Sequence, residues 1–246
     1  MSVKFLRSDE PEKKKKKVAL LGTVPHKMKA PFADPSFEIW AIAHACLGDP
    51  LPRVDRIFEI HKWDEVVKWG SLGAFAAWPT VPTYIINADE HPEMPQAKSF
   101  PFDDLDAKFQ IFKDRKESHM TNSISWMIAM AIDEGYDEIH IYGVNMSHHS
   151  EYGTQKPSCE YYLGLAQGKG ITIYVPPESD LLKSFFLYGK DEEKQADLQK
   201  KLEDRLNWLT SQLNMYQNQR GQIEQAVQQH IGAIEDVKFM MQMFKQ

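Results

Sequence analysis

The sequence predicts an α/β protein of the Rossmann-like kind, with a mainly parallel sheet covered by helices on both faces, followed by a long C-terminal helix that forms a coiled coil. Two observations carry this prediction. Over residues 18–189, short apolar segments alternate with helix-spaced segments, which is typical of a parallel sheet with right-handed crossovers. Over residues 198–241, an apolar heptad repeat runs without a proline, which is typical of a coiled coil.

The composition narrows the class of protein. The chain has 246 residues, 42% of them hydrophobic, which suits one α/β domain with an appendage. Its formal net charge of −6 argues against non-specific binding of nucleic acid, because phosphate contacts need clustered cations. The two cysteines, Cys46 and Cys159, lie far apart and predict no disulfide. No apolar run reaches the roughly 20 residues of a membrane span, so we expect a cytoplasmic protein.

Residues 1–17 are predicted to form a disordered basic arm. The arm ends in five consecutive lysines and contains no apolar segment of the kind found in secretory signals. A lysine run of this sort is either a solvated tail or a contact for phosphate or an acidic surface.

The strands are predicted from short apolar runs bounded by glycine, proline or polar residues. In chain order they are residues 18–22, 38–43, 56–61, 82–87, 138–143 and 171–175. Helices are predicted at residues 63–69, 122–135, 158–167 and 179–186, the last with Ser179 as its cap. Residues 88–118 contain several prolines and are expected to be irregular as far as the 104–113 stretch.

Residues 121–146 are the clearest helix-and-strand unit. Thr121 or Asn122 can cap the helix, since a short polar side chain accepts N–H groups of the first turn. Apolar residues then recur at helical spacing as far as Ile132, and Gly135 fits the position just after a helix.

Ligand-binding residues are expected beyond the carboxyl ends of the strands, where open parallel sheets bind ligands. Glycine lets a backbone N–H approach a ligand closely, and the free N–H groups at a helix start favour an anion. Three segments are expected to converge there: residues 22–25, 121–123 and 143–146. Each segment alone also fits an ordinary turn or cap, but together on one rim they predict a nucleotide or phosphate site. The predicted binding residues are Gly22, Thr23, Pro25, Asn122, Ser123, Gly143 and Asn145.

A polar loop after the 138–143 strand holds the predicted catalytic residues. His148 or His149 can accept a proton near neutral pH, and Glu151 can orient the ring. The loop also fits a solvated turn, and no third ligand at a suitable spacing supports a metal site. His61, just past the third strand, is either a second catalytic candidate or a satisfied histidine at the edge of the core. Glu160 faces the same rim or solvent.

Residues 190–246 are predicted to form a helical oligomerisation tail. Its apolar residues keep an unbroken 4-3-4-3 spacing from Leu202 to Met241, about 60 Å in one helix. Arg220 and His230 occupy seam positions, where polar residues set register or oligomer state. Gly221 leaves open a hairpin instead of a straight helix. In either geometry the stripe needs a partner, so we expect a homo-oligomer through residues 198–241.

Three segments resemble, in order, the core of a known family. They are VALLGTVP at 18–25, TNSISWMIAMAIDEGYDEIHIYGVNM at 121–146 and ITIYVPPESDLLKSF at 171–185. This pattern resembles the bacterial sialyltransferases of the Campylobacter type and the related MptE-like family, which includes pterin-diphosphokinase proteins. The resemblance covers most of residues 18–187 and none of the tail. It implies a Rossmann-like domain that binds a nucleotide or nucleotide-sugar, and the sequence indicates no cofactor beyond that ligand.

The sequence departs from the family pattern at its most specific positions. Val24 stands where the second glycine of the first turn would be, His26 where the serine would be, and Asn145 replaces the usual aspartate. Ala43-His44 lies where the sialyltransferases carry an asparagine after the second strand. The tail resembles those of tailed-phage proteins, which suggests a phage origin and location in the host cytoplasm.

Two functions of different class follow from the sequence. The first is a transferase-like protein in which His148 or His149, the nearest positional match to the family's catalytic histidine, removes a proton from an acceptor hydroxyl. The second is a non-catalytic, oligomeric adaptor or inhibitor protein that binds a nucleotide or a host protein. A third hypothesis is that the protein is a purely structural scaffold.

Overall fold

The computed structural model describes residues 15–112, 114, 118–147, 151–184 and 187–244, with the backbone alone for 192–196. The chain divides into two compact units, Met1–Lys183 and Ser184–Gln246. The first unit contains the sheet and its covering helices, and the second contains one long helix.

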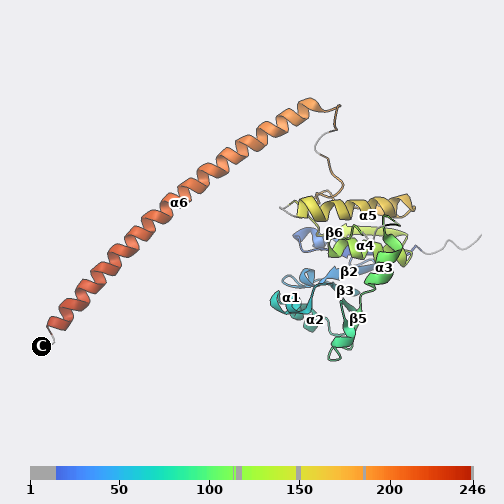
Figure 1. The fold of residues 1–246 in the computed structure, drawn as a ribbon, viewed down its shortest axis with the longest axis horizontal. Helices are drawn as coiled ribbons and strands as arrows, with labels where there is room; N and C mark the ends of the chain where they lie inside the picture. Colours follow the sequence, from blue (N-terminus) through green and yellow to red (C-terminus); the bar gives the residue numbers. More distant parts are fainter. Residues whose placement is uncertain (1–14, 113, 115–117, 148–150, 185–186, 245–246) are drawn as a thin grey trace, which may run out of the picture. The chain divides into compact units, whose positions relative to one another are not determined.

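Seven parallel strands of the described chain form one sheet, in the order β5-β4-β3-β2-β1-β6-β7 (Figure 1). The predicted α/β fold is therefore confirmed. The centre of the sheet is β1, which pairs with β2 on one side and with β6 on the other. The chain reverses its direction of travel across the sheet at this point, so the topological switch point lies between β1 and β6. The strands are β1 (Lys17–Leu21), β2 (Phe37–Ile42), β3 (Arg56–Glu59), β4 (Thr83–Ile85), β5 (Ala97–Ser99), β6 (Glu138–Tyr142) and β7 (Thr172–Tyr174).

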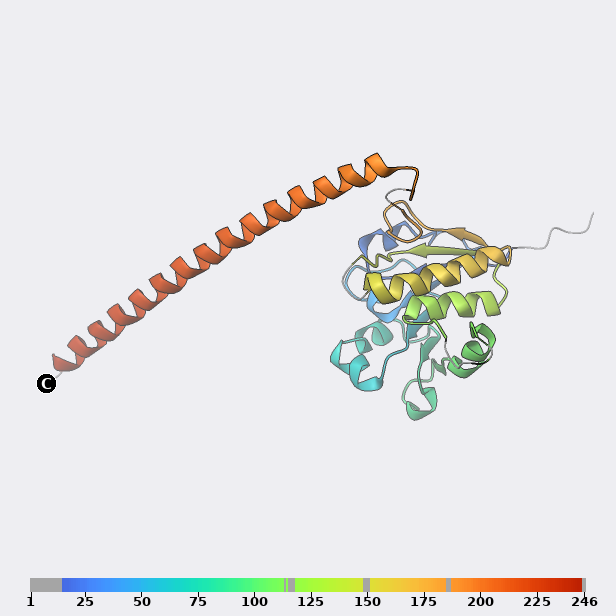
Figure 2. The same cartoon turned by 45° about the horizontal axis from the view of Figure 1, so that its top comes forward.

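Helices cover both faces of the sheet. One face packs against α3 (Phe102–Phe109), α4 (Ser123–Asp133) and α5 (Lys156–Gly168), and α4 and α5 lie side by side (Figure 2). The other face packs against shorter elements. These are α1 (Trp63–Lys68), α2 (Leu72–Ala77), and the 3-10 turns η1 (Pro25–Lys29) and η2 (Ala43–Cys46). Of two further turns, η3 (Ala88–Glu90) follows β4, and the π-helical η4 (Glu151–Gln155) precedes α5.

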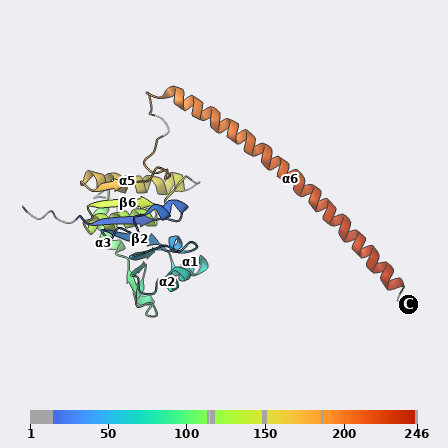
Figure 3. The same cartoon turned by 180° about the vertical axis from the view of Figure 1, so that it is seen from behind.

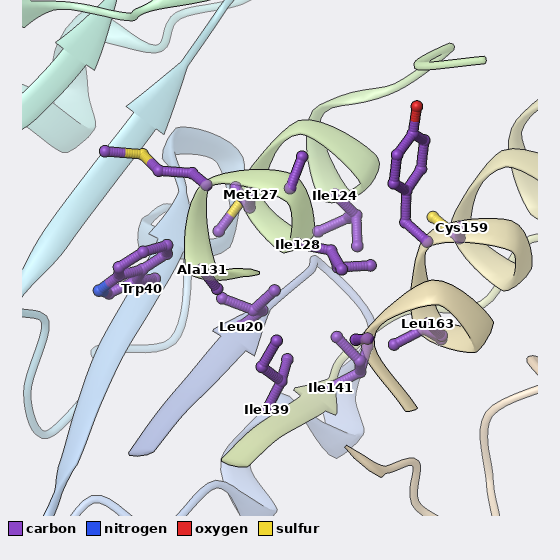
Figure 4. Close-up of a cluster of buried hydrophobic side chains, with 14 of the residues drawn as sticks. Leu20, Trp40, Ile124, Met127, Ile128, Ala131, Ile139, Ile141, Cys159 and Leu163 are labelled. Carbon is purple, nitrogen blue, oxygen red and sulfur yellow. The ribbon is translucent and has the colours of Figure 1, made fainter. Parts of the chain in front are cut away.

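The core is split in two by the alternation of side chains along β1. Leu20 packs beneath α4 and α5 (Figure 4), and Val18 belongs to the same cluster. Ala19 and Leu21 pack on the opposite face. All four are completely buried. A strand buried on both faces has no polar side, which is why this segment appears in the sequence as a continuous apolar run.

The edge strand β5 and the short helix α2 are among the elements that the sequence did not predict. The edge strand β5 has the sequence AKS, and its residues are half-buried or exposed, so no apolar alternation marks it. Its backbone pairs with β4, with Tyr84 opposite Lys98. The short helix α2 is also absent from the sequence prediction, because its LGAFAA segment offers too few turns for a helical period to show.

The helix predicted at residues 179–186 is wrong over the part that the structure describes, because residues 177–182 form turns and bends there. The Ser179 hydroxyl does not cap a helix but donates to the Val144 carbonyl, 2.7 Å away, in the loop after β6. Asp180 accepts the N–H of Met146 at 2.8 Å. These long-range hydrogen bonds and the buried Leu181 hold the segment against the sheet edge.

The second unit is one continuous helix, α6 (Glu192–Met243), of 52 residues (Figure 3). Of the two geometries left open for the tail, the straight helix is the one present, with no hairpin at Gly221. The apolar seam is exposed in the single chain: Leu206 and Ile223, for example, are each 63% exposed. None of the described helices combines the length and apolarity of a membrane span.

Candidate functional site

A cavity of about 250 Å³ opens at the sheet edge, at the carboxyl ends of β1, β2, β3 and β6. The three segments that were predicted to converge all contribute to its wall. Pro25, the first residue of η1, is the one predicted binding residue outside it. The lining residues are Gly22, Thr23, Val24, Ile42, His61, Thr121, Asn122, Ser123, Ile124, Gly143, Val144, Asn145, Met146, Glu151 and Gln155.

Gly22 and Gly143 face each other across the switch point. A Cβ atom on Gly22 would lie 2.4 Å from the Gly143 carbonyl oxygen, and one on Gly143 would lie 2.6 Å from the Gly22 oxygen. Gly143 also has a φ of +69°, which other residues rarely adopt. The two glycines therefore let the loops after β1 and β6 pack backbone against backbone.

The backbone N–H groups of both glycines are already used. The Gly22 N–H donates to the Tyr142 carbonyl at 2.8 Å, and the Gly143 N–H donates to His26 Nδ1 at 2.9 Å. The expectation that Gly22 offers its N–H to a ligand is therefore wrong. These glycines shape the floor of the cavity and leave ligand contacts to other residues.

The start of α4 supplies free donors to the cavity. Asn122 is the N-cap, and its Oδ1 accepts the Ser125 N–H at 3.0 Å. The N–H groups of Ser123 and Ile124 in the first turn have no acceptor within the described residues, and both residues line the cavity. Two unpaired N–H groups at the positive end of a helix form a favourable place for an anion.

The Asn122 side chain is a positioning group in this arrangement. Its Nδ2 donates to the Ser125 hydroxyl at 2.9 Å and to the Gln155 carbonyl at 3.1 Å. Ser125 in turn lies 2.7 Å from Ser158 on α5, and both serines are completely buried. This network fixes the start of α4 against η4 and α5, so a ligand at the cavity would meet a rigid helix end.

Thr23, Asn145 and Ser123 are the predicted binding residues whose side chains remain available. Thr23 and Asn145 are exposed, and Ser123 is half-buried. None of the three side chains has a hydrogen-bond partner within the described part of the chain. They can therefore donate and accept hydrogen bonds to a polar ligand in the cavity.

The structure describes only some of the predicted catalytic residues. His148 and His149 lie outside the described residues. Glu151 opens η4 and lines the cavity. Glu160 does not line it: its carboxylate accepts the Leu182 N–H at 2.7 Å.

A histidine and glutamate pair, missed as a pair by the sequence analysis, stands at the end of β3. His61 lines the cavity, and its Nδ1 lies 2.5 Å from Oε1 of Glu59, whose other oxygen accepts the Ser71 hydroxyl at 2.5 Å. Glu59 is only 2% exposed, and His44 lies 3.7 Å away from it. The sequence signal for this pair was Glu59, which stands between the apolar residues Phe58 and Ile60 and two residues before His61.

The pair shifts both ionisation equilibria toward the charged forms. The hydrogen bond to Glu59 raises the pKa of His61 above 6.5, although burial acts in the opposite direction. Burial raises the pKa of Glu59, but the hydrogen bonds from His61 and Ser71 outweigh it and leave that pKa below its ordinary value. Glu59 is therefore an ionised carboxylate that orients the His61 ring.

Among the described residues, no group of three or more metal-ligating side chains is arranged to hold an ion.

No protein-family model and no curated protein matches the chain. Several solved structures are similar to the chain at 15–18% sequence identity. One is the sialyltransferase CstII from Campylobacter jejuni with cytidine-5'-monophosphate: 17% identity, TM-score 0.44, covering 70% of this chain and 88% of that one. The structure of CstII with a trisaccharide acceptor and CMP is 17% identical in sequence, with a TM-score of 0.44, and the match covers 70% of this chain and 89% of that one. The structure of monomeric CstII is 16% identical in sequence, with a TM-score of 0.45, and the match covers 72% of this chain and 91% of that one. Similarity at this level says nothing about what this chain binds.

Proposed function

We propose that the chain binds a nucleotide or nucleotide-sugar in the switch-point cavity and transfers the sugar to an acceptor hydroxyl. The observation that supports this most is the start of α4, where the unpaired N–H groups of Ser123 and Ile124 border a cavity at the carboxyl edge of a parallel sheet. The resemblance of three sequence segments to nucleotide-sugar-dependent transferases points to the same ligand class.

In this proposal the phosphate lies at the first turn of α4. Thr23 and Asn145, which follow β1 and β6, are the groups available to the ribose or base. Gly22 and Gly143 hold the two loops together, and Asn122 holds the helix start.

A single substitution can test the role of the helix start without disturbing the helix. Ser123 is the first residue of α4, where proline is well tolerated, and Asn122 before it is extended, with φ −162° and ψ 163°. Ser123→Pro removes the N–H and the hydroxyl, and Ser123→Ala removes the hydroxyl alone. Because a hydrogen bond to a charged group contributes about 1.5–3 kcal/mol, we expect Ser123→Pro to weaken nucleotide binding at least about tenfold relative to Ser123→Ala.

The measurement is isothermal titration with CMP, CDP, UMP, UDP, AMP and ADP, with thermal unfolding as the check on folding. At least one nucleotide should bind the wild-type chain, and both variants should unfold at the wild-type temperature. Equal affinity of the proline and alanine variants would place the phosphate elsewhere. A wild-type chain that binds none of the six would refute the proposal.

The proton acceptor in the transfer step was predicted to be His148 or His149, oriented by Glu151. That assignment stays a prediction, because the two histidines lie outside the described residues. If that assignment is correct, the double alanine variant loses sugar transfer and keeps nucleotide binding. Unchanged turnover in the double variant would remove the assignment and leave the proton to another base.

The exposed seam of α6 favours a second candidate, an oligomeric binding protein without turnover. In that case a nucleotide would raise the unfolding temperature, but the chain would neither hydrolyse nor transfer any sugar-nucleotide. Nucleotide binding accompanied by release of the sugar decides for the transferase.

A further inference from the structure

A second cavity, of about 160 Å³, adjoins the first along the same sheet edge, at the carboxyl ends of β3 and β4. His61 lines both cavities and so stands at their common wall. The other lining residues are Lys62, Trp63, Ile85, Ile86, Asn87, Glu90 and His91.

The walls of the second cavity are polar, aromatic and fixed by internal contacts. Asn87 Nδ2 donates to Glu90 Oε1 at 2.9 Å. The His91 ring stacks on Trp63 with the ring centroids 3.6 Å apart, and its Nδ1 lies 3.2 Å from Glu93. Groups that donate and accept hydrogen bonds beside a flat aromatic surface suit a neutral, hydroxyl-rich ligand. Glu90 in the wall and Glu93 beside His91 offset the positive charge of Lys62, so the cavity has no excess of positive charge to favour an anion.

The His61 ring has one nitrogen left for chemistry. Because Nδ1 donates to the Glu59 carboxylate, the neutral ring has its lone pair on Nε2, which has no partner within the described residues. The side chain is 40% exposed, so this edge of the ring is accessible. A buried carboxylate that orients an accessible imidazole is an arrangement that general bases use.

We infer that the second cavity is the acceptor subsite of the proposed transferase, that it takes a neutral sugar, and that His61, positioned by Glu59, accepts the proton of the reacting hydroxyl. This inference rests on the proposed function, since the first cavity must hold the donor.

The step balances with the donor as its only co-reactant. The acceptor oxygen forms a bond to the anomeric carbon of the nucleotide-sugar, and the bond from that carbon to the phosphate oxygen breaks. The bonding electron pair leaves on the nucleotide phosphate. The hydroxyl proton moves to Nε2 of His61, and the imidazolium that forms is stabilised by the ionised Glu59.

The subsite can be tested by binding alone. Saturation-transfer NMR on the full chain, free and nucleotide-saturated, would use methyl glucoside, methyl galactoside, methyl mannoside and N-acetylglucosamine as probes. The test variant is Asn87→Ala/Glu90→Gln. The control is Asp89→Asn, an exposed residue on the same turn that does not line the cavity.

We expect at least one sugar to bind the wild type and the control, with its signal reduced at least fivefold in the double variant. Nucleotide affinity should stay within twofold in both variants. No sugar signal, or an equal signal in the double variant, would overturn the subsite. Failure of the separate nucleotide titration would overturn the proposed function instead, since the sugar experiment on the free chain does not depend on it.

The role of His61 is tested by nucleotide release from sugar-nucleotides in the presence of the bound sugar. Loss of a general base lowers turnover by roughly 10²–10⁴-fold, so His61→Gln should lose at least 100-fold in kcat and keep its nucleotide affinity. Turnover should also rise with pH through the His61 pKa, and Glu59→Gln should move that inflection to lower pH. The charged groups around the ring are Glu59 on β3, Glu65 on α1 and, across Glu59, His44 on η2.

Two results would overturn the assignment of His61. One is wild-type turnover in His61→Gln with loss of turnover in His148→Ala/His149→Ala, which would place the base in that loop. The other is a wild-type chain that releases no nucleotide with any donor and sugar.

Discussion

At the scale of the residue, Gly22 and Gly143 hold the loops after β1 and β6 together at the floor of the cavity. Gly22 and Gly143 were predicted to line a ligand site because glycine permits close approach, and both do line the cavity. What approaches each glycine, however, is the backbone of the other. Sequence patterns show that a position needs glycine, but only the fold shows which group lies against it.

We predict that Gly22→Ala destabilises the first unit by about 1–3 kcal/mol, the range expected when an atom is forced into a packed site. The added methyl group would lie 2.4 Å from the Gly143 oxygen, and backbone on both sides leaves little room to relax. Urea unfolding would measure the loss. Gly164→Ala on α5 is the control, because a Cβ there meets nothing within 4 Å, and it should stabilise by about 0.5–1 kcal/mol. Equal stability of Gly22→Ala and wild type would refute the backbone contact.

His26 illustrates a substitution whose purpose the sequence could not reveal. It stands where the family pattern has serine, and its Nδ1 accepts the Gly143 N–H at 2.9 Å, which ties η1 to the end of β6. Burial lowers the pKa of His26 below its ordinary value of 6.5, partly opposed by Glu178. The ring is therefore neutral when it accepts this hydrogen bond.

A pH dependence of stability follows from that contact. Since the folded chain holds the His26 proton less tightly than the unfolded chain, the contribution of His26 is fully present above pH 6.5 and is lost as the pH falls through the folded pKa. The free energy of unfolding should thus differ most between wild type and His26→Gln at pH 7.5, and the difference should shrink toward pH 5. A difference that is constant or grows on acidification would contradict this account.

At the scale of the element, the sequence predicted the strands that carry apolar side chains and missed the edge strand β5, which carries almost none. The segment 18–22 is apolar because packed elements cover both faces of β1, so its side chains record its position. The edge strand β5 is three residues long, with the sequence AKS and two exposed side chains, so it leaves no such record. Ser179 looked like a helix cap because a serine hydroxyl can accept a local N–H or donate over a long distance, and here it donates to Val144.

The long helix α6 makes its own prediction, because its seam is exposed along its length in one chain. We expect the seam to pack against a second copy, so the full chain should be an oligomer and a chain ending at Gly189 a monomer by light scattering. Leu213→Glu, at a seam position, should shift the full chain toward the monomer, while Asn218→Glu, off the seam, should not. Equal subunit numbers in the full and shortened chains would rule out assembly through α6.

At the scale of the whole molecule, the sequence was sufficient for the fold class and for the position of the cavity at the sheet edge, but it did not identify the Glu59–His61 pair. Strand order follows from βαβ connections, and the switch point then brings Gly22, Asn122 and Asn145 together. The role of the Glu59–His61 pair could not be predicted, because the contact of Glu59 with Ser71 forms only in the fold. Nothing in the sequence spacing indicates that His61 lies between two cavities.

The central claim is that a nucleotide binds at the switch point with its phosphate at the start of α4. A crystal structure of the full chain with the tightest-binding nucleotide of the panel tests it most directly. The account predicts a phosphate oxygen about 3 Å from the N–H groups of Ser123 and Ile124, with the nucleoside between the loops after β1 and β6. A nucleotide bound on another surface, or in the cavity with its phosphate away from α4, would contradict it.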